Sequence, residues 1–240
     1  MNYNDITLSK LAIACLMYNS LTPFNDSLKL LKEATDDCIV LTNPGHRKSL
    51  LKWLNDWGCR NLAKKHHKIA SESIQDWQQK YSASLFSDRK PIWNLSDNEL
   101  KAAANAYGAL KDMPGARRER DGTKQEVRIG ETAASKILFA IRPEALMPWD
   151  EAMRKRYQCD GSPESYLKYL KIIRDLTYHI RDLCENKGLK IDDLPGELGR
   201  PESTVLALVN EYIYVIVTRE VTRERELPSP QTLKQWAELG

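Results

Sequence analysis

Helix-start signals recur along this 240-residue chain, and they constrain its fold more than any other feature of the sequence. In each signal, a residue suited to capping a helix lies within two positions of a proline or precedes a glutamate by three positions. The signals lie at Thr22-Pro23, Asn43-Pro44, Ser96 to Glu99, Pro148 to Asp150, Ser162-Pro163 and Ser229-Pro230. Because apolar residues follow them at helical spacing, the sequence predicts an all-α protein.

The apolar stripes predict about ten helices. They cover residues 7–19, 22–34, 44–57, 61–81, 96–111, 133–141, 150–156, 163–187 and 201–217, with a short last helix after Pro230 that contains Trp236. Residues 36–41 fit a small strand as well as an irregular segment. No alternation of strands and helices is visible, which argues against a parallel sheet. We therefore expect one compact all-α unit over residues 1–240, or two packed helical subdomains of about 1–112 and 127–240 joined by a polar loop at 113–126.

Positive charge is concentrated in two stretches, although the net charge is only +3. Residues 46–68 carry one acid and seven bases: Arg47, Lys48, Lys52, Arg60, Lys64, Lys65 and Lys68. A second stretch contains Arg117, Arg118, Arg120, Lys124 and Arg128. Such clusters suit a polyanion, and DNA is the partner that they predict. The alternative is a solvated helix face beside a loop.

The cysteines and the apolar runs indicate a cytoplasmic, soluble protein. Cys15, Cys38, Cys59, Cys159 and Cys184 are odd in number and widely spaced, so we expect them to stay reduced. This spacing does not form a metal site or the closely spaced four-cysteine loop of an iron–sulfur cluster, and we predict no cofactor. The run at residues 11–18 is too short to span a membrane, and residues 1–10 do not resemble a signal peptide. The oligomeric state is left open.

Residues 127–156 contain the candidate catalytic residues. A turn at Gly130 opens a helix whose apolar residues point in several directions, among them Ala133, Ile137 and Leu138. A helix of this kind has neighbours on more than one side, so we predict that it is central and buried. Its strongly polar positions, Lys136 and Arg142, are then predicted to face an opening that Asp150 borders. Asp150 is itself predicted to cap the next helix.

The spacing in this segment resembles the endonuclease III-like DNA glycosylases. Gly130 and Asp150 stand 20 residues apart, with Thr132-Ala133 in the helix-opening positions and a proline-containing loop before Asp150. In that family the corresponding residues are the second half of a helix-hairpin-helix motif and a catalytic Asp. The resemblance covers about thirty of the 240 residues, and the Leu-Pro-Gly lead-in of the hairpin is missing.

The resemblance implies a helix-hairpin-helix architecture and hydrolysis of an N-glycosidic bond in DNA. Asp150 would stabilise the oxocarbenium-like sugar and position the attacking water. Gly130 and Thr132 would lie at a helix N-terminus that can receive a phosphate. Relatives that also cut the backbone use a lysine as nucleophile, but the matching position here is Thr132. This departure from the pattern makes a glycosylase without lyase activity the expected enzyme. Lys136 lies one turn later on the same face and is the second catalytic candidate, since it could cooperate with Asp150 in a cleft.

A non-enzymatic reading stands beside the catalytic one. In it the chain is an all-α module that binds a protein or nucleic acid, and Asp150 only caps a helix. An enzyme needs Asp150 at a cleft wide enough for a flipped nucleotide, with basic residues around it. For nucleic-acid contact the candidates are Gly130, Thr132, Arg117, Arg118, Lys64, Lys65 and Lys68. The tryptophans at 53, 57, 77 and 93 are predicted to be core residues rather than surfaces for stacking bases.

Overall fold

The computed structural model describes residues 6–87, 89–120 and 123–219. Within these ranges the chain forms ten α-helices and one two-stranded sheet, which confirms the predicted all-α class. The elements are α1 (Leu8–Leu21), α2 (Phe24–Glu33), α3 (Pro44–Asp56), α4 (His67–Tyr81), α5 (Asp97–Lys111), β1 (Pro114–Arg120), β2 (Thr123–Arg128), α6 (Glu131–Ile141), α7 (Glu151–Arg156), α8 (Pro163–Glu185), α9 (Leu194–Glu197) and α10 (Val205–Ile213). The short helix predicted after Pro230 lies outside the described residues. Across these ranges, every helix is too short or too polar to cross a membrane.

Local capping explains where most helices begin. The Asn43 side chain accepts a hydrogen bond from the backbone N–H of Gly45, at 2.8 Å. Ser96 and Glu99 form a complete capping box, in which each side chain accepts from the other residue's backbone N–H. At the starts of α7 and α8, the side chains of Asp150 and Ser162 each accept a hydrogen bond from the backbone N–H three residues later. These contacts confirm the predicted starts of the four helices. Each cap stabilises its helix by about 1 kcal/mol.

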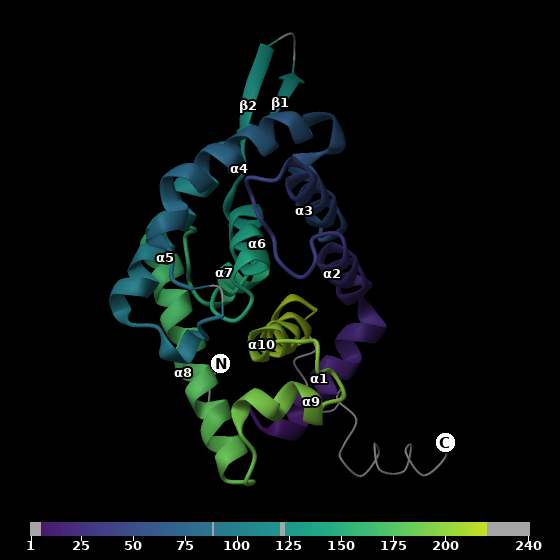
Figure 1. The fold of residues 1–240 in the computed structure, drawn as a ribbon, viewed down its shortest axis with the longest axis vertical. Helices are drawn as coiled ribbons and strands as arrows, with labels where there is room; N and C mark the ends of the chain where they lie inside the picture. Colours follow the sequence, from purple (N-terminus) through teal and green to yellow (C-terminus); the bar gives the residue numbers. More distant parts are fainter. Residues whose placement is uncertain (1–5, 88, 121–122, 220–240) are drawn as a thin grey trace.

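Helix α6 lies at the centre of the molecule, between α3 and α5 (Figure 1). Seven of its eleven residues are buried: Ala133, Ala134, Ser135, Ile137, Leu138, Phe139 and Ile141. The Phe139 ring stacks on Trp57 at the end of α3, with 5.9 Å between centroids. The prediction of a central, buried helix after Gly130 is therefore confirmed.

Helices from both ends of the chain share one core. Helix α1 packs against α10, and α5 packs against both α6 and α8. At the α5–α8 contact, the ring of Tyr107 stacks on Tyr166 with centroids 4.2 Å apart. Gly108 permits this approach, because a Cβ built there would lie 2.5 Å from the Pro163 ring. Trp53, Trp57, Trp77 and Trp93 are all buried, as predicted.

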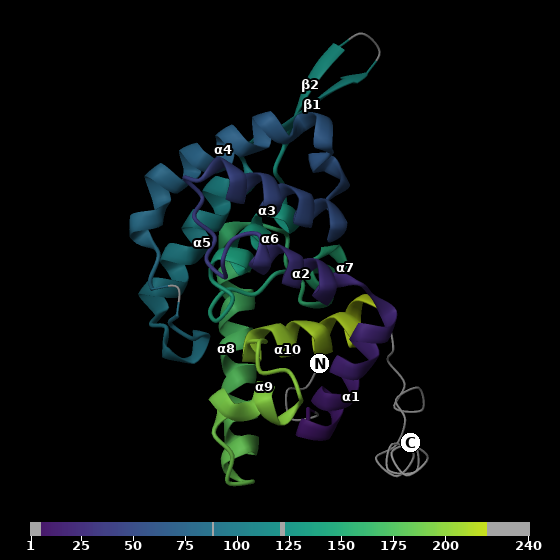
Figure 2. The same cartoon turned by 45° about the vertical axis from the view of Figure 1, so that its right-hand side comes forward.

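The polar loop predicted at 113–126 is instead a β-hairpin. Strands β1 and β2 pair antiparallel, with a bulge between Pro114 and Ala116, and the hairpin projects beyond α4 (Figure 2). Its base is fixed to the helices, because Ala116 is fully buried and Gly115 approaches the side chain of Leu62. The strands carry too few apolar residues to show an alternating pattern. The signal that indicates a hairpin is the dipeptide Asp121-Gly122, which favours a two-residue turn.

Two predicted helix starts are wrong. The helix expected from Asn61 begins at His67, after the 3₁₀ turns η2 (Arg60–Leu62) and η3 (Lys64–His66). Residues 36–41, which fitted a strand or an irregular segment, are irregular: turns at 36–37 and 41 flank three residues without regular structure. The helix expected from Pro201 begins at Val205, because Thr204 is the residue that caps it, and ends in a π-helical turn, Tyr214–Thr218.

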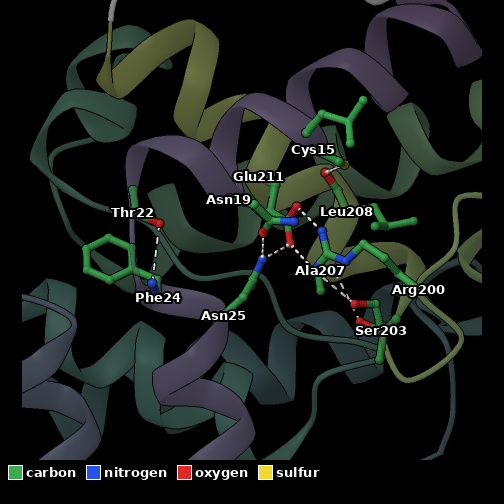
Figure 3. A network of polar contacts seen from close by, with 12 residues as sticks. Cys15, Asn19, Thr22, Phe24, Asn25, Arg200, Ser203, Ala207, Leu208 and Glu211 are labelled. Atoms are coloured by element: carbon green, nitrogen blue, oxygen red, sulfur yellow. Dashed lines mark hydrogen bonds and ion pairs between the residues drawn. The ribbon is translucent and has the colours of Figure 1, made fainter. Parts of the chain in front are cut away.

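A buried ion pair connects the last helices to the first (Figure 3). The guanidinium of Arg200 contacts both carboxylate oxygens of Glu211 on α10, one of them at 2.6 Å. Glu211 also accepts from Asn25 on α2, and the Glu211 side chain is only 2% exposed. Burial raises the pKa of the Glu211 carboxyl, and the neighbouring guanidinium opposes that shift.

The five cysteines are all free thiols, and four of them are buried. Burial raises the pKa of the thiols at Cys15, Cys59, Cys159 and Cys184. Cys38, in the turn after α2, is exposed. Thiol reactivity needs the thiolate, so the four buried cysteines act as small apolar side chains.

We expect Leu138→Ala to lower the free energy of unfolding by about 2–5 kcal/mol, because Leu138 is fully buried in α6 and its truncation leaves a cavity. Chemical denaturation measures the change. The exposed Leu30 on α2 provides a matched control, and Leu30→Ala should cost less than about 0.5 kcal/mol. A loss below about 1 kcal/mol for Leu138→Ala would contradict the central position of α6.

We expect Glu211→Gln and Arg200→Gln to destabilise the fold by about 3–5 kcal/mol each, because either change leaves a buried partner without its counter-charge. The double variant should cost clearly less than the sum of the two, and a double-mutant cycle in urea measures this coupling. Additive losses would show that the pair contributes no specific interaction.

Candidate functional site

The loop before Asp150 is fixed by hydroxyl groups. The Tyr166 hydroxyl donates to the backbone carbonyl of Met147 at 3.0 Å, and the Tyr169 hydroxyl donates to that of Pro148 at 3.2 Å. The next residue, Trp149, donates its backbone N–H to the Ser135 hydroxyl of α6 at 3.1 Å. Three successive residues are thus held by buried contacts, and they place Asp150 at a defined position beside α6.

Both carboxylate oxygens of Asp150 are hydrogen-bonded. Oδ1 accepts from the backbone N–H of Met153 at 2.8 Å, which is the predicted helix cap. Oδ2 accepts from the Thr218 hydroxyl at 2.7 Å. Thr218 belongs to the π-helical turn that follows α10. Asp150 is therefore half-buried between α7 and the end of the described chain.

Lys136 and Asp150 line the same pocket. The Lys136 ammonium donates to the backbone carbonyl of Trp57 and lies 5.5 Å from the centroid of the Trp57 ring. Arg142, predicted to face this opening, does not line it. Its guanidinium contacts the carbonyls of Phe86 and Ile141 and borders another cavity, because Arg142 lies after the end of α6 and the chain turns there.

Aromatic rings from several elements form much of the pocket wall. They are Tyr18 of α1, Phe24 of α2, Trp57 after α3, Tyr214 of the π-helical turn and Trp149 of the loop before α7. Phe24 is 5.5 Å from Trp57 and 5.8 Å from Tyr214, measured between ring centroids. The pocket has a volume of about 30 Å³, which is enough for one or two water molecules and too little for a nucleobase.

Sequence reasoning missed these walls. Tyr18 and Phe24 come from the first two helices and Tyr214 from the far end of the chain, and nothing in the sequence distinguishes them from ordinary core residues. Trp57 was expected in the core and is indeed buried, but it also forms part of the pocket. No signal in the sequence links these positions, because their proximity comes from tertiary packing.

Gly130 and Thr132 lie between this pocket and the hairpin. Gly130 has φ +81° and donates its N–H to the Lys111 carbonyl at 2.9 Å, so this N–H is used within the fold. The Thr132 hydroxyl accepts from Arg154 of α7 at 3.2 Å. Asn61 donates to the carbonyl of Ile129 at 3.0 Å and thereby joins the turn to the segment that carries Lys64 and Lys65.

The two basic stretches of the sequence come together in the fold. Strand β1 packs against α4 and against the turns η2 and η3. Figure 1 shows the hairpin and α4 together at one end of the molecule. The exposed Lys64 and Lys65 belong to η3, Lys68 to α4, and the exposed Arg117 and Arg118 to β1, so all five lie at this end. We call these five residues the basic end. Among the described residues, none of these five side chains forms a salt bridge with an acidic residue. Glu126 is the cross-strand neighbour of Arg117.

A second, larger cavity lies away from the basic end. Its volume is about 1080 Å³, and it is enclosed by α2, the end of α6 and residues 200–207. Both acidic and basic side chains surround it, among them Lys29, Glu33, Arg89 and Glu144. In the ranges that the structure covers, His, Cys, Asp and Glu side chains do not gather in groups of three that could hold a metal ion.

No protein-family model, curated protein or solved structure matches the chain. The basis for assigning a function is therefore the geometry of the basic end and of the Asp150 pocket.

Proposed function

We propose that this protein binds nucleic acid through the basic end. The observation that carries the proposal is the packing of the hairpin against the α3–α4 connection, which brings Arg117 and Arg118 to the same end as Lys64, Lys65 and Lys68. Charges about 50 residues apart in the sequence thereby form one surface. A phosphate backbone is a regular row of negative charges, and exposed lysines and arginines bind it by displacing its counterions.

The Asp150 pocket supports a second candidate function, base excision by a glycosylase without lyase activity. The specific observation is that a carboxylate and an ammonium group line one aromatic pocket. In this reaction Asp150 would stabilise the positive charge that develops on the sugar as the base departs. Aromatic walls would stack on an extruded base.

An extruded base would fit only if the pocket opened. Thr218, which binds Asp150, and Tyr214, which lines the pocket, both belong to the π-helical turn, and such turns occur often at functional sites. Movement of this turn would release the second oxygen of Asp150 and widen the pocket. Trp57 connects the pocket to the basic end, because the chain passes from Trp57 through Gly58 into η2 and η3.

Replacing Lys64, Lys65 and Lys68 together with Gln should weaken DNA binding and flatten its salt dependence. The slope of log K against log salt should fall by about one unit for each phosphate that the variant no longer binds. Fluorescence anisotropy over a salt series measures both quantities. The exposed lysines 101, 187 and 190 lie on α5 and after α8, and their triple Gln variant is the matched control.

The control variant should retain the slope of the parent protein, because it removes the same charge from another surface. Equal slopes in the parent and in the Lys64/Lys65/Lys68 variant would locate binding elsewhere. If the parent protein binds neither DNA nor RNA at any salt concentration, the proposed function fails.

Asp150→Asn should abolish release of damaged bases from duplex oligonucleotides and leave the fold intact. Asn caps a helix as well as Asp does, so the hydrogen bond from Met153 is kept while the negative charge is removed. Base release and thermal unfolding are measured together. Thr218→Val is the control, because it removes the hydroxyl that occupies Oδ2 and keeps the carboxylate.

The Thr218→Val variant should keep its excision activity. Turnover in Asp150→Asn equal to that of the parent protein would remove Asp150 from the mechanism. A parent protein without excision activity on any tested lesion would leave nucleic-acid binding as the function of the chain.

A further inference from the structure

The two faces of the β1–β2 hairpin differ in charge. In the observed register Arg118 lies opposite Gln125, and Arg117 lies opposite Glu126. Directly opposed residues of an antiparallel pair share a face, and successive residues alternate between the faces. Glu126 therefore offsets the charge of Arg117. The other positions on the face of Arg118 are 116, 120, 123, 125 and 127. They are Ala, Arg, Thr, Gln and Val, so no acid lies among them.

The face of Arg118 is also the one directed at the helices that carry the lysines. Ala116 lies two residues earlier on this face and is fully buried, and β1 packs against α4, η2 and η3. The hairpin stands away from the helical body beyond this contact (Figure 2). Arg118 and the exposed Lys64, Lys65 and Lys68 thus lie on two adjoining surfaces that meet at Ala116.

The dimensions of the hairpin suit the major groove of B-form DNA. The four residues from Arg117 to Arg120 extend about 13 Å beyond the buried base, at about 3.3 Å per residue. The major groove is about 8.5 Å deep and about 12 Å wide, and it admits a two-stranded ribbon. The minor groove is about half as wide, and the major groove of A-form RNA is too narrow for side chains to read.

We propose that the hairpin enters the major groove of double-stranded DNA with its Arg118 face, while Lys64, Lys65 and Lys68 contact phosphates beside the groove. Arg118 and Gln125 lie opposite each other, and Arg and Gln are side chains that form paired hydrogen bonds with guanine and adenine edges. This inference rests on the proposed nucleic-acid binding and names its substrate class, duplex DNA.

The first experiment compares three probes of equal length and sequence: duplex DNA, single-stranded DNA and duplex RNA. The full chain should bind duplex DNA at least about tenfold more tightly than either of the others, because only that probe presents a groove of the right width. Duplex DNA methylated at guanine N7, which lies in the major groove, should bind more weakly than the unmodified duplex.

The second experiment compares Arg118→Gln with Arg117→Gln. Both residues are exposed, adjacent on β1 and equal in charge, and they differ in the face that they occupy. Arg118→Gln should weaken duplex binding by about tenfold and lower the salt slope by about one unit. Arg117→Gln should also weaken duplex binding, but only by about two- to threefold, because Glu126 already offsets part of its charge and Arg117 lies on the other face. Thermal unfolding verifies that both variants remain folded.

The outcomes separate this inference from the proposed function. Binding to single strands or duplex RNA as tight as to duplex DNA, or equal losses of affinity in the two arginine variants, would overturn groove insertion and leave nucleic-acid binding standing. Unchanged affinity for N7-methylated DNA would also overturn it. If the parent protein binds none of the probes, the proposed function fails and groove insertion fails with it.

Discussion

The absence of a continuous polar face on α6 is the constraint on which the rest of this structure depends. A helix that is apolar on several sides is stable only when neighbours cover each of those sides. Here α3, α5 and the loop before α7 supply that cover, with Trp57 and Trp149 packed close to α6. Lys136 is the exception within the helix, and its side chain extends from the core into the pocket beside Asp150.

The sequence predicted those features that depend on contacts between residues close together along the chain. Helix starts at Asn43, Ser96, Asp150 and Ser162 were predictable, because each cap is a contact within three residues. The burial of α6 followed from its composition. The hairpin was missed, because most of its side chains are polar and its stability depends on the anchoring of Gly115 and Ala116 against helices distant in sequence.

The candidate site also has a part that the sequence predicts and a part that it does not. Asp150 and its capping role could be read from the chain, and so could the two concentrations of positive charge. The sequence could not predict that those charges lie side by side, or that aromatic rings form the pocket wall. Both features arise where segments far apart in sequence pack together. The small size of the pocket is likewise a tertiary property. The π-helical turn contributes to it, because Tyr214 of this turn lines the pocket.

The distribution of the thiols gives the native chain a single natural attachment point. Four cysteines are enclosed in the core, so a maleimide dye added to the folded protein reacts at Cys38 alone. Cys38 borders the larger cavity, which lies away from the hairpin and its neighbouring lysines. A fluorophore placed there would report on that cavity in the unmutated protein, independently of events at the basic end.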